Sequence, residues 1–185
     1  MATINGKALV KDGKAVDKVF SNGRQVYGRN LIHDTSFEQG LWKKAFGNPN
    51  FEVTNEGNIK FSITNIGMNG VGAPLEPVEM FKQYTLTVKV RGRGKFMPYI
   101  MYNGISNMNL YIDLGATYQM INSATEFVEI KYTFIPRYRD TTKQGVFAVL
   151  TAESVGNWLE IKKYSLKFEA GNMPTPWTPA PEDYI

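Results

Sequence analysis

The sequence predicts an all-β protein, a β-sandwich of the jelly-roll type with an N-terminal β-hairpin ribbon. Short segments of alternating apolar and polar residues recur about every ten residues, and turn-forming Gly, Asn and Pro residues separate them. No stretch of about ten or more residues has helical periodicity. The chain of 185 residues is long enough for one domain with a full core, and its aromatic content of 13% suits pleated sheets.

Residues 1–29 are expected to form the ribbon. Asn5-Gly6, Asp12-Gly13 and Asn22-Gly23 are signals for tight hairpin turns, because both central positions of such a turn need positive φ. These residues contain six basic and two acidic side chains, so they carry the whole net charge of +4. The rest of the chain is neutral, which argues against nucleic acid as a partner. A short ribbon is marginal alone, so we expect it to dock on the main domain, a second copy of the chain or a larger assembly.

Residues 30–171 are expected to form the sandwich. Its predicted strands are 31–32, 51–53, 59–63, 84–90, 96–102, 110–114, 128–134, 146–150 and 158–168. Strand 158–168 should contain a bulge at Lys162-Lys163, because the apolar residues change there from odd-numbered to even-numbered positions. Gly67–Pro77, rich in glycine and proline, is expected to be a long irregular loop.

The run from Lys89 to Lys95 places four cations on one parity and is expected to cross a turn. Either it is a solvated hairpin tip, or it contacts an anionic polymer such as a phosphate-bearing glycan. Residues 172–185 contain four prolines and should run extended along the surface as a strap, held to the domain by Trp177.

No constellation for catalysis is visible. The single histidine, His33, has no nucleophile or metal partner nearby in the sequence, and there is no cysteine, phosphate-binding loop or zinc motif. We therefore do not expect an enzyme. A glycan-cleaving enzyme stays an alternative, because sequence spacing does not exclude two carboxylates facing each other across a cleft. No apolar run is long enough to span a bilayer, so no membrane partner is expected.

Aromatic side chains near turns and strand ends suggest a saccharide site, because sugar rings stack on aromatic rings while polar side chains bind the hydroxyls. For each tyrosine, a place in the core is the alternative. The candidates for stacking are Trp42, Tyr99, Tyr102 and Trp158, and the polar candidates are Arg91, Arg93 and Asn103.

Two segments resemble carbohydrate-binding modules. The opening motif N-L-I-H-D-T-S-F-E-Q-G-L-W (Asn30–Trp42) resembles the first strand of modules related to families 4, 9 and 22. The tail Y-S-L-K-F-E-A-G-N-M-P-T-P-W-T-P-A-P-E-D (Tyr164–Asp183) and the lead-in Lys18–Leu31 are similar to segments of tail and baseplate proteins from phages of Gram-positive bacteria. The resemblance implies a jelly roll that binds host cell-wall saccharide. It also implies a structural calcium at Glu38 and Glu169, although Glu169 replaces the aspartate usual in such modules.

The leading hypothesis is a non-catalytic carbohydrate-binding module that mediates adhesion of a phage virion to host cell-wall saccharide. The protein would then be located in the virion, at the tail or baseplate, and act at the host cell surface. Its partners would be a saccharide and, through the ribbon, other virion proteins. The alternative is a structural protein that decorates the virion or joins its subunits without binding glycan.

Overall fold

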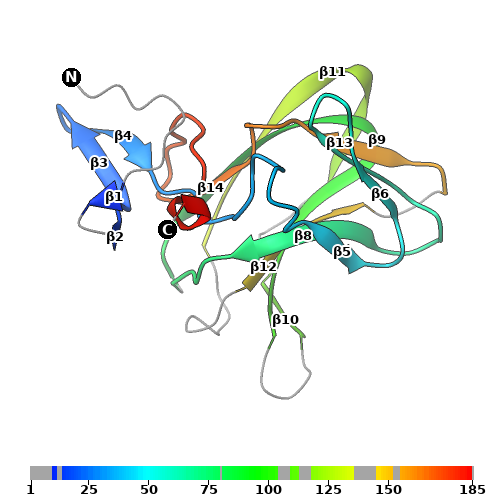
Figure 1. Cartoon of the computed structure of the whole chain (residues 1–185), viewed down its shortest axis with the longest axis horizontal. Helices are drawn as coiled ribbons and strands as arrows, with labels where there is room; N and C mark the ends of the chain where they lie inside the picture. The colour runs from blue at the N-terminus through cyan, green and yellow to red at the C-terminus, as the bar shows by residue number, and fades with distance from the viewer. Residues whose placement is uncertain are drawn as a thin grey trace.

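The computed structural model describes residues 10–11, 14–79, 81–103, 109–112, 118–135, 145–151 and 155–184 (Figure 1). These residues form fourteen β-strands and one short 3₁₀ helix, as the prediction of an all-β fold requires. No helix among them is long and apolar enough to cross a membrane.

Ten of the strands form two layers that share one strand (Figure 1). We call the first layer the β8 sheet. Its strand order is β5 (Lys43–Phe46), β8 (Asn69–Leu75), β12 (Gly145–Thr151), β9 (Tyr84–Asn103) and β10 (Asn109–Ile112). All of its neighbouring strands are antiparallel.

We call the second layer the β13 sheet. Its strands are β6 (Asn50–Val53), β7 (Ile59–Ser62), β13 (Trp158–Ile161), β14 (Lys167–Ala170), the first part of β9, and β11 (Gln119–Phe134). Strands β13 and β14 pair with successive parts of the same edge of β9, and β11 pairs with its other edge. The hydrophobic core lies between the two sheets and includes Phe61, Leu86, Phe96, Leu159 and Phe168, each at most 1% exposed.

The shared strand β9 corrects the prediction of a turn between residues 89 and 95. The predicted strands 84–90 and 96–102 are one strand of 20 residues, and the basic run lies inside it. Gly92 and Gly94 have φ of 145° and 142°, values that other residues rarely adopt. A Cβ at Gly92 would also overlap the carbonyl oxygen of Trp158 on β13. The glycines therefore let β9 pass from one sheet into the other, whereas in the sequence they suggest a turn.

The prediction of an irregular loop at Gly67–Pro77 is also wrong, because most of this segment is β8. Gly72 pairs with Lys43 of β5 on one side and with Ala148 of β12 on the other. Glycine and proline are depleted in strands, but pairing with two neighbours overrides that weak preference. Strand β5 was not predicted from the sequence either.

The ribbon consists of two small hairpins, β1 (Val10–Lys11) with β2 (Lys14–Ala15) and β3 (Lys18–Ser21) with β4 (Arg24–Gly28). The predicted turn at Asn22-Gly23 is confirmed, since these residues have φ of 50° and 75°. The turn signals Asn5-Gly6 and Asp12-Gly13 lie outside the described residues.

The closing strand is interrupted where the parity change predicted a bulge. The interruption is larger than one extra residue, because β13 ends at Ile161, a turn follows at Lys163-Tyr164, and β14 begins at Lys167. Beyond β14, the strap is less exposed than predicted. Thr175, Thr178 and Pro179–Pro181 are buried, and the 3₁₀ helix η1 (Pro181–Tyr184) follows. Trp177 helps to hold the strap as predicted, since its Nε1 donates a hydrogen bond to Thr35 Oγ1 (3.2 Å).

Candidate functional site

The outer face of the β13 sheet carries a polar and aromatic site. On β13, Leu159 and Ile161 point into the core, so Trp158 and Glu160 face the opposite side. The strand registers place Trp158 between Ser62 of β7 and Arg93 of β9. The same row continues to Asn50 on β6 and Asn122 on β11, since residues paired across strands share a face.

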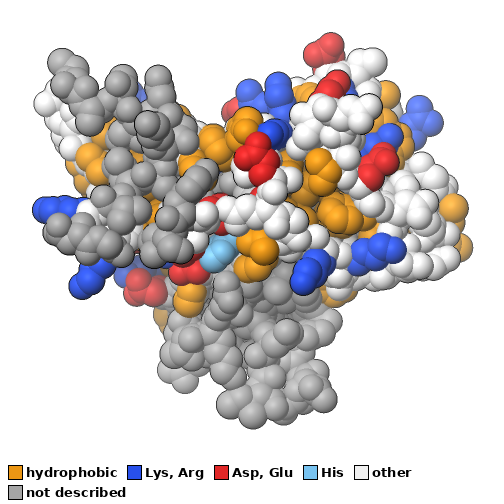
Figure 2. All heavy atoms as spheres, viewed as in Figure 1, with side chains coloured by type: hydrophobic (Ala, Val, Ile, Leu, Met, Phe, Trp, Pro, Cys, Tyr) orange, Lys and Arg blue, Asp and Glu red, His pale blue; other side chains and the backbone are white. Residues whose placement is uncertain are grey.

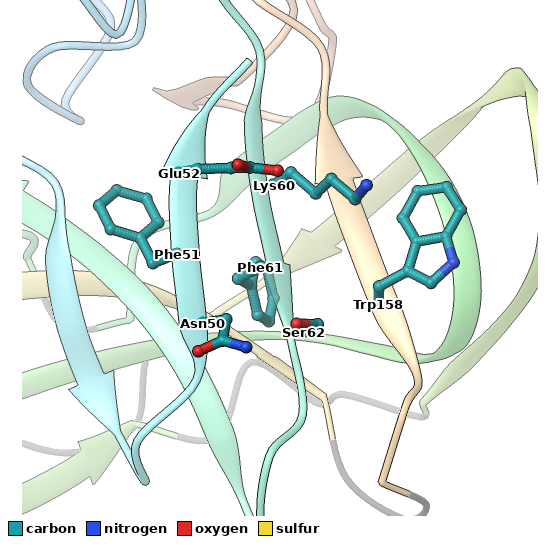
Figure 3. A pocket seen from close by; sticks show the side chains of 7 residues that line it. All are labelled: Asn50, Phe51, Glu52, Lys60, Phe61, Ser62 and Trp158. Atoms are coloured by element: carbon teal, nitrogen blue, oxygen red, sulfur yellow. The ribbon is translucent and has the colours of Figure 1, made fainter.

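A pocket of about 430 Å³ opens beside Trp158 (Figure 3). The Lys60 side chain extends towards the indole, and its Nζ lies 4.9 Å from the ring centre. Trp158 is partly exposed, so a ligand can reach the ring. The pocket thus combines an aromatic surface with hydrogen-bonding groups, and its lining residues are Asn50, Phe51, Glu52, Lys60, Phe61, Ser62 and Trp158.

The predicted ligand residue Arg91 is used within the protein. Its guanidinium donates to both carboxylate oxygens of Glu160, at 2.9 and 2.8 Å. Glu160 is 3% exposed and also accepts a hydrogen bond from Asn58 Nδ2 (2.8 Å). A bulge in β11 places the Phe127 ring 4.5 Å from the Arg91 guanidinium. The hydrogen bond with Glu160 raises the pKa of Arg91, so this residue supports the face as a fixed cation.

Arg93 differs from Arg91 in that it is exposed, and the structure shows no ion pair for it within the described residues. Its Cα partner on β13 is Trp158. Among the predicted ligand residues whose side chains the structure describes, Arg93 and Trp158 are therefore neighbours on the exposed face.

The prediction that Trp42 stacks on a ligand is wrong. Trp42 is 5% exposed, and its Nε1 donates to the carbonyl oxygen of Asp34 (2.9 Å). Its ring packs edge-on against Phe37, with the ring centres 5.4 Å apart. Trp42 therefore belongs to the core under the opening loop.

The other three candidates stay predictions. Tyr99, Tyr102 and Asn103 lie in β9, and their side chains fall outside the described residues.

The two carboxylates implied for calcium do not fit a shared ion. Glu38 is exposed, and its Oε1 accepts hydrogen bonds from Lys163 Nζ (2.6 Å) and Tyr164 OH (3.1 Å). Glu169 is 1% exposed, and its oxygens accept hydrogen bonds from the Thr175 amide and hydroxyl (both 2.7 Å). Lys167 Nζ lies 3.9 Å from Glu169. Each carboxylate thus has a lysine in place of a metal.

His33 belongs to an ion-pair network where the strap meets the opening motif. Its Nε2 lies 2.8 Å from Glu76 Oε1. The possible metal-ligand atoms of His33, Glu76 and Glu182 lie within 4.8 Å of one another. This is the one group of three or more possible metal ligands among the described residues. Arg29 donates to both Glu76 (2.9 Å) and Glu182, so this group already holds a cation. Figure 2 shows the histidine at the surface next to acidic side chains.

Protonation of His33 should make stability depend on pH. The hydrogen bond to Glu76 raises the pKa of His33 above its usual value of 6.5. The stabilisation is therefore complete below pH 6.5 and is lost as the pH rises through the folded-state pKa. We expect the free energy of unfolding of the wild type, measured in urea, to fall by about 1 kcal/mol between pH 6 and pH 8. His33→Gln should remove this slope, and an unchanged slope in the variant would contradict the assignment.

Sequence reasoning identified Trp158 and Arg93 but missed their neighbours Asn50, Lys60 and Ser62. Alternation within β7 places Lys60 and Ser62 on the polar side of that strand. What the sequence does not contain is the register that aligns β7 with β13.

Comparisons with known proteins bear on the fold. No protein-family model and no curated protein matches the sequence. Among solved structures, a xylan-binding domain of Paenibacillus barcinonensis has a TM-score of 0.53 and 9% identity, covering 79% of this chain and 98% of that domain. The N-terminal cellulose-binding domain of a Cellulomonas fimi β-1,4-glucanase has a TM-score of 0.55 and 13% identity, covering 80% of this chain and 100% of that domain.

An arabinose-bound α-L-arabinofuranosidase is also similar, with a TM-score of 0.56 and 16% identity over 76% of this chain. The match spans only 26% of that enzyme, so it covers one part of a larger protein. At these identities the likeness establishes the fold. The chain is a β-sandwich built like the carbohydrate-binding modules that it resembles in structure.

Proposed function

We propose that this protein is a non-catalytic module that binds saccharide chains on the outer face of the β13 sheet. The observation that carries the proposal is the row containing Ser62, Trp158 and Arg93, with Lys60 beside the indole. The indole offers a flat apolar surface for a sugar ring, and the hydroxyl, guanidinium and ammonium groups can bind sugar hydroxyls. The sandwich fold supports this proposal, because similar structures include domains whose names describe binding to xylan and cellulose.

Trp158→Ala should weaken saccharide binding about tenfold or more, equivalent to about 1.4 kcal/mol, because it removes the stacking surface. Affinity is to be measured by calorimetry with xylan, cellohexaose and purified cell-wall polysaccharide from Gram-positive bacteria. Phe20→Ala is the matched control, since Phe20 is an aromatic side chain on the ribbon with 60% exposure. It should leave affinity unchanged. Failure of the wild type to bind any of these saccharides would contradict the proposed function.

The finer proposal is that the module attaches a phage virion to host cell-wall saccharide. The resemblance of the lead-in Lys18–Leu31 and the tail Tyr164–Asp183 to segments of phage tail and baseplate proteins supports it. The hairpins β1–β2 and β3–β4 form sheets separate from the sandwich, and Phe20 on β3 is exposed, as expected of a segment that docks on another virion protein. Many copies on one particle would strengthen weak binding by each module.

A deletion of residues 1–23, which removes β1 to β3 with Phe20 but keeps the buried Tyr27 and Gly28, separates adhesion from a purely structural role in the virion. A fluorescent fusion of the shortened chain should still decorate Gram-positive cells, while incorporation into virions should be lost. If virions need the module but neither form decorates cells, the structural alternative is favoured.

A further inference from the structure

A second groove, of about 360 Å³, lies on the same face of the β13 sheet. It is bounded on one side by the interruption between β13 and β14, and on the other by residues 174–177 of the strap. Lys162 follows Trp158 by four residues, about 13 Å along an extended strand. The groove lining consists of Thr87, Val88, Lys89, Glu129, Lys162, Lys163, Tyr164, Ser165, Pro174, Thr175, Pro176 and Trp177.

The aromatic wall of this groove is held in place from several sides. Tyr164 is 47% exposed, and its ring centre lies 4.8 Å from that of Trp177. Its hydroxyl donates to Glu38 (3.1 Å), and Lys163 Nζ lies 4.6 Å from its ring centre. Tyr164 has φ of 58°, a conformation uncommon for a residue with a side chain. Such strain persists where the surroundings enforce it and is frequent at binding sites.

Cations flank the aromatic wall. The Lys162 amide donates to the carbonyl of Lys89 (2.9 Å), so the two lysines are neighbours in the sheet. Lys89 Nζ lies 3.8 Å from Glu129, and both side chains are exposed. Lys162 Nζ lies 5.3 Å from the Phe127 ring, and within the described residues it has no ion pair. The groove therefore has a positive charge that its own carboxylate does not balance.

We propose that this groove is a second saccharide subsite, and that it takes an anionic sugar unit. The sugar ring would lie against Tyr164 and Trp177, and its carboxylate or phosphate would be bound by Lys89 and Lys162. This inference rests on the proposed function, and it names acidic polysaccharides as the ligand class.

Two variants test the groove without disturbing its backbone. Tyr164→Asn removes the ring, and asparagine tolerates positive φ. Lys162→Gln removes the cation and keeps the length of the side chain. Lys14→Gln, an exposed lysine on β2 of the ribbon, is the matched control for charge. Thermal unfolding should show that all three variants remain folded.

Binding is to be measured with polygalacturonate as the carboxylate probe, phosphomannan as the phosphate probe and xylan as the neutral probe. We expect Tyr164→Asn and Lys162→Gln each to weaken binding of at least one acidic polymer fivefold or more, while xylan binding stays unchanged. The acidic polymer that is affected identifies the anionic group. Binding of that polymer should weaken with added salt, because exposed charges are screened.

The outcomes separate the two proposals. If Trp158→Ala weakens saccharide binding but neither groove variant changes it, the subsite is overturned and the proposed function stands. An equal loss of acidic polymer binding in Lys14→Gln would also overturn the subsite, since net charge alone would then explain the affinity. If the wild type binds saccharides but neither acidic polymer, the subsite is overturned and the proposed function stands. If it binds none of these probes, nor cellohexaose nor the cell-wall polysaccharide, the proposed function fails, and the subsite fails with it.

Discussion

Replacing Asn30 by alanine should destabilise the fold by about 4 kcal/mol, the largest effect of a single substitution that we expect. Asn30 has no exposed surface and links the opening motif, the closing strand and the strap. The two N–H groups of its Nδ2 serve three acceptors, Thr35 Oγ1 (3.0 Å), Leu166 O (3.2 Å) and Thr178 O (3.0 Å), so that one N–H is shared. Its Oδ1 accepts from the amides of Ile32 (3.3 Å) and Phe168 (3.1 Å). Alanine would remove these hydrogen bonds at a buried site, where each group left unsatisfied costs about 1–3 kcal/mol; Thr35 Oγ1 would keep the hydrogen bond from Trp177 Nε1.

Urea unfolding at pH 7 measures the effect. Asn30→Asp has nearly the same volume, but it places an oxygen where Nδ2 donates. We therefore expect it to lower the free energy of unfolding at least as much as Asn30→Ala does. This would show that hydrogen bonding, and not lost volume, is the cause. Asn172→Ala is the control, because Asn172 is exposed on the strap, and it should change stability by less than about 0.5 kcal/mol. A loss below about 1 kcal/mol in both Asn30 variants would contradict the role of this side chain.

Local alternation predicted the strands whose pattern is set by one buried face. Segment 59–63 alternates because Ile59 and Phe61 point into the core, and 84–90 alternates because Leu86, Val88 and Val90 do. The turn at Asn22-Gly23 was predicted because its positive φ values demand such residues. These features depend on neighbours in the sequence, so the sequence alone is sufficient to predict them.

The failures have the opposite origin, since they depend on contacts with distant strands. Gly72 is in a strand because β5 and β12 both pair with it. Gly92 lies where β13 passes so closely that a Cβ would overlap its backbone. In a sequence, such glycines look like those of a turn, because the crowding that selects them comes from distant residues.

The same distinction applies to the candidate site. Trp158 was identified because a tryptophan at a strand end is conspicuous, but nothing local distinguishes it from Trp42, which the structure buries. The register that places Ser62 beside Trp158 and the strap that places Trp177 beside Tyr164 are long-range features. The sequence thus named residue types for the candidate site, whereas their grouping required the fold.

The buried lysine under the strap gives the second large effect. Lys167 is 1% exposed, and its Nζ donates to Thr175 Oγ1 (2.8 Å) and to the carbonyl oxygen of Pro176 (2.7 Å). Its nearest carboxylate, Glu169, is equally buried. Desolvation lowers the pKa of Lys167 to about 8 and raises the pKa of Glu169. Gly28, at the end of the ribbon, packs directly against the Glu169 carboxylate, which a Cβ at this position would overlap. The pair therefore lies buried between the ribbon end, β14 and the strap.

Lys167→Met should destabilise the protein by about 3 kcal/mol, because it leaves the Glu169 charge buried without a cation and removes two hydrogen bonds to the strap. The double variant Lys167→Met with Glu169→Met should be more stable than Lys167→Met alone, since removing both charges of a buried pair costs less than removing one. Urea unfolding at pH 7 gives the three free energies, and limited proteolysis within residues 172–176 reports release of the strap. Lys43→Met, at an exposed lysine of β5, is the control and should change neither quantity. If Lys167→Met matched the wild type in both measurements, the other contacts of the strap would be sufficient to hold it, and the role assigned to Lys167 would be contradicted.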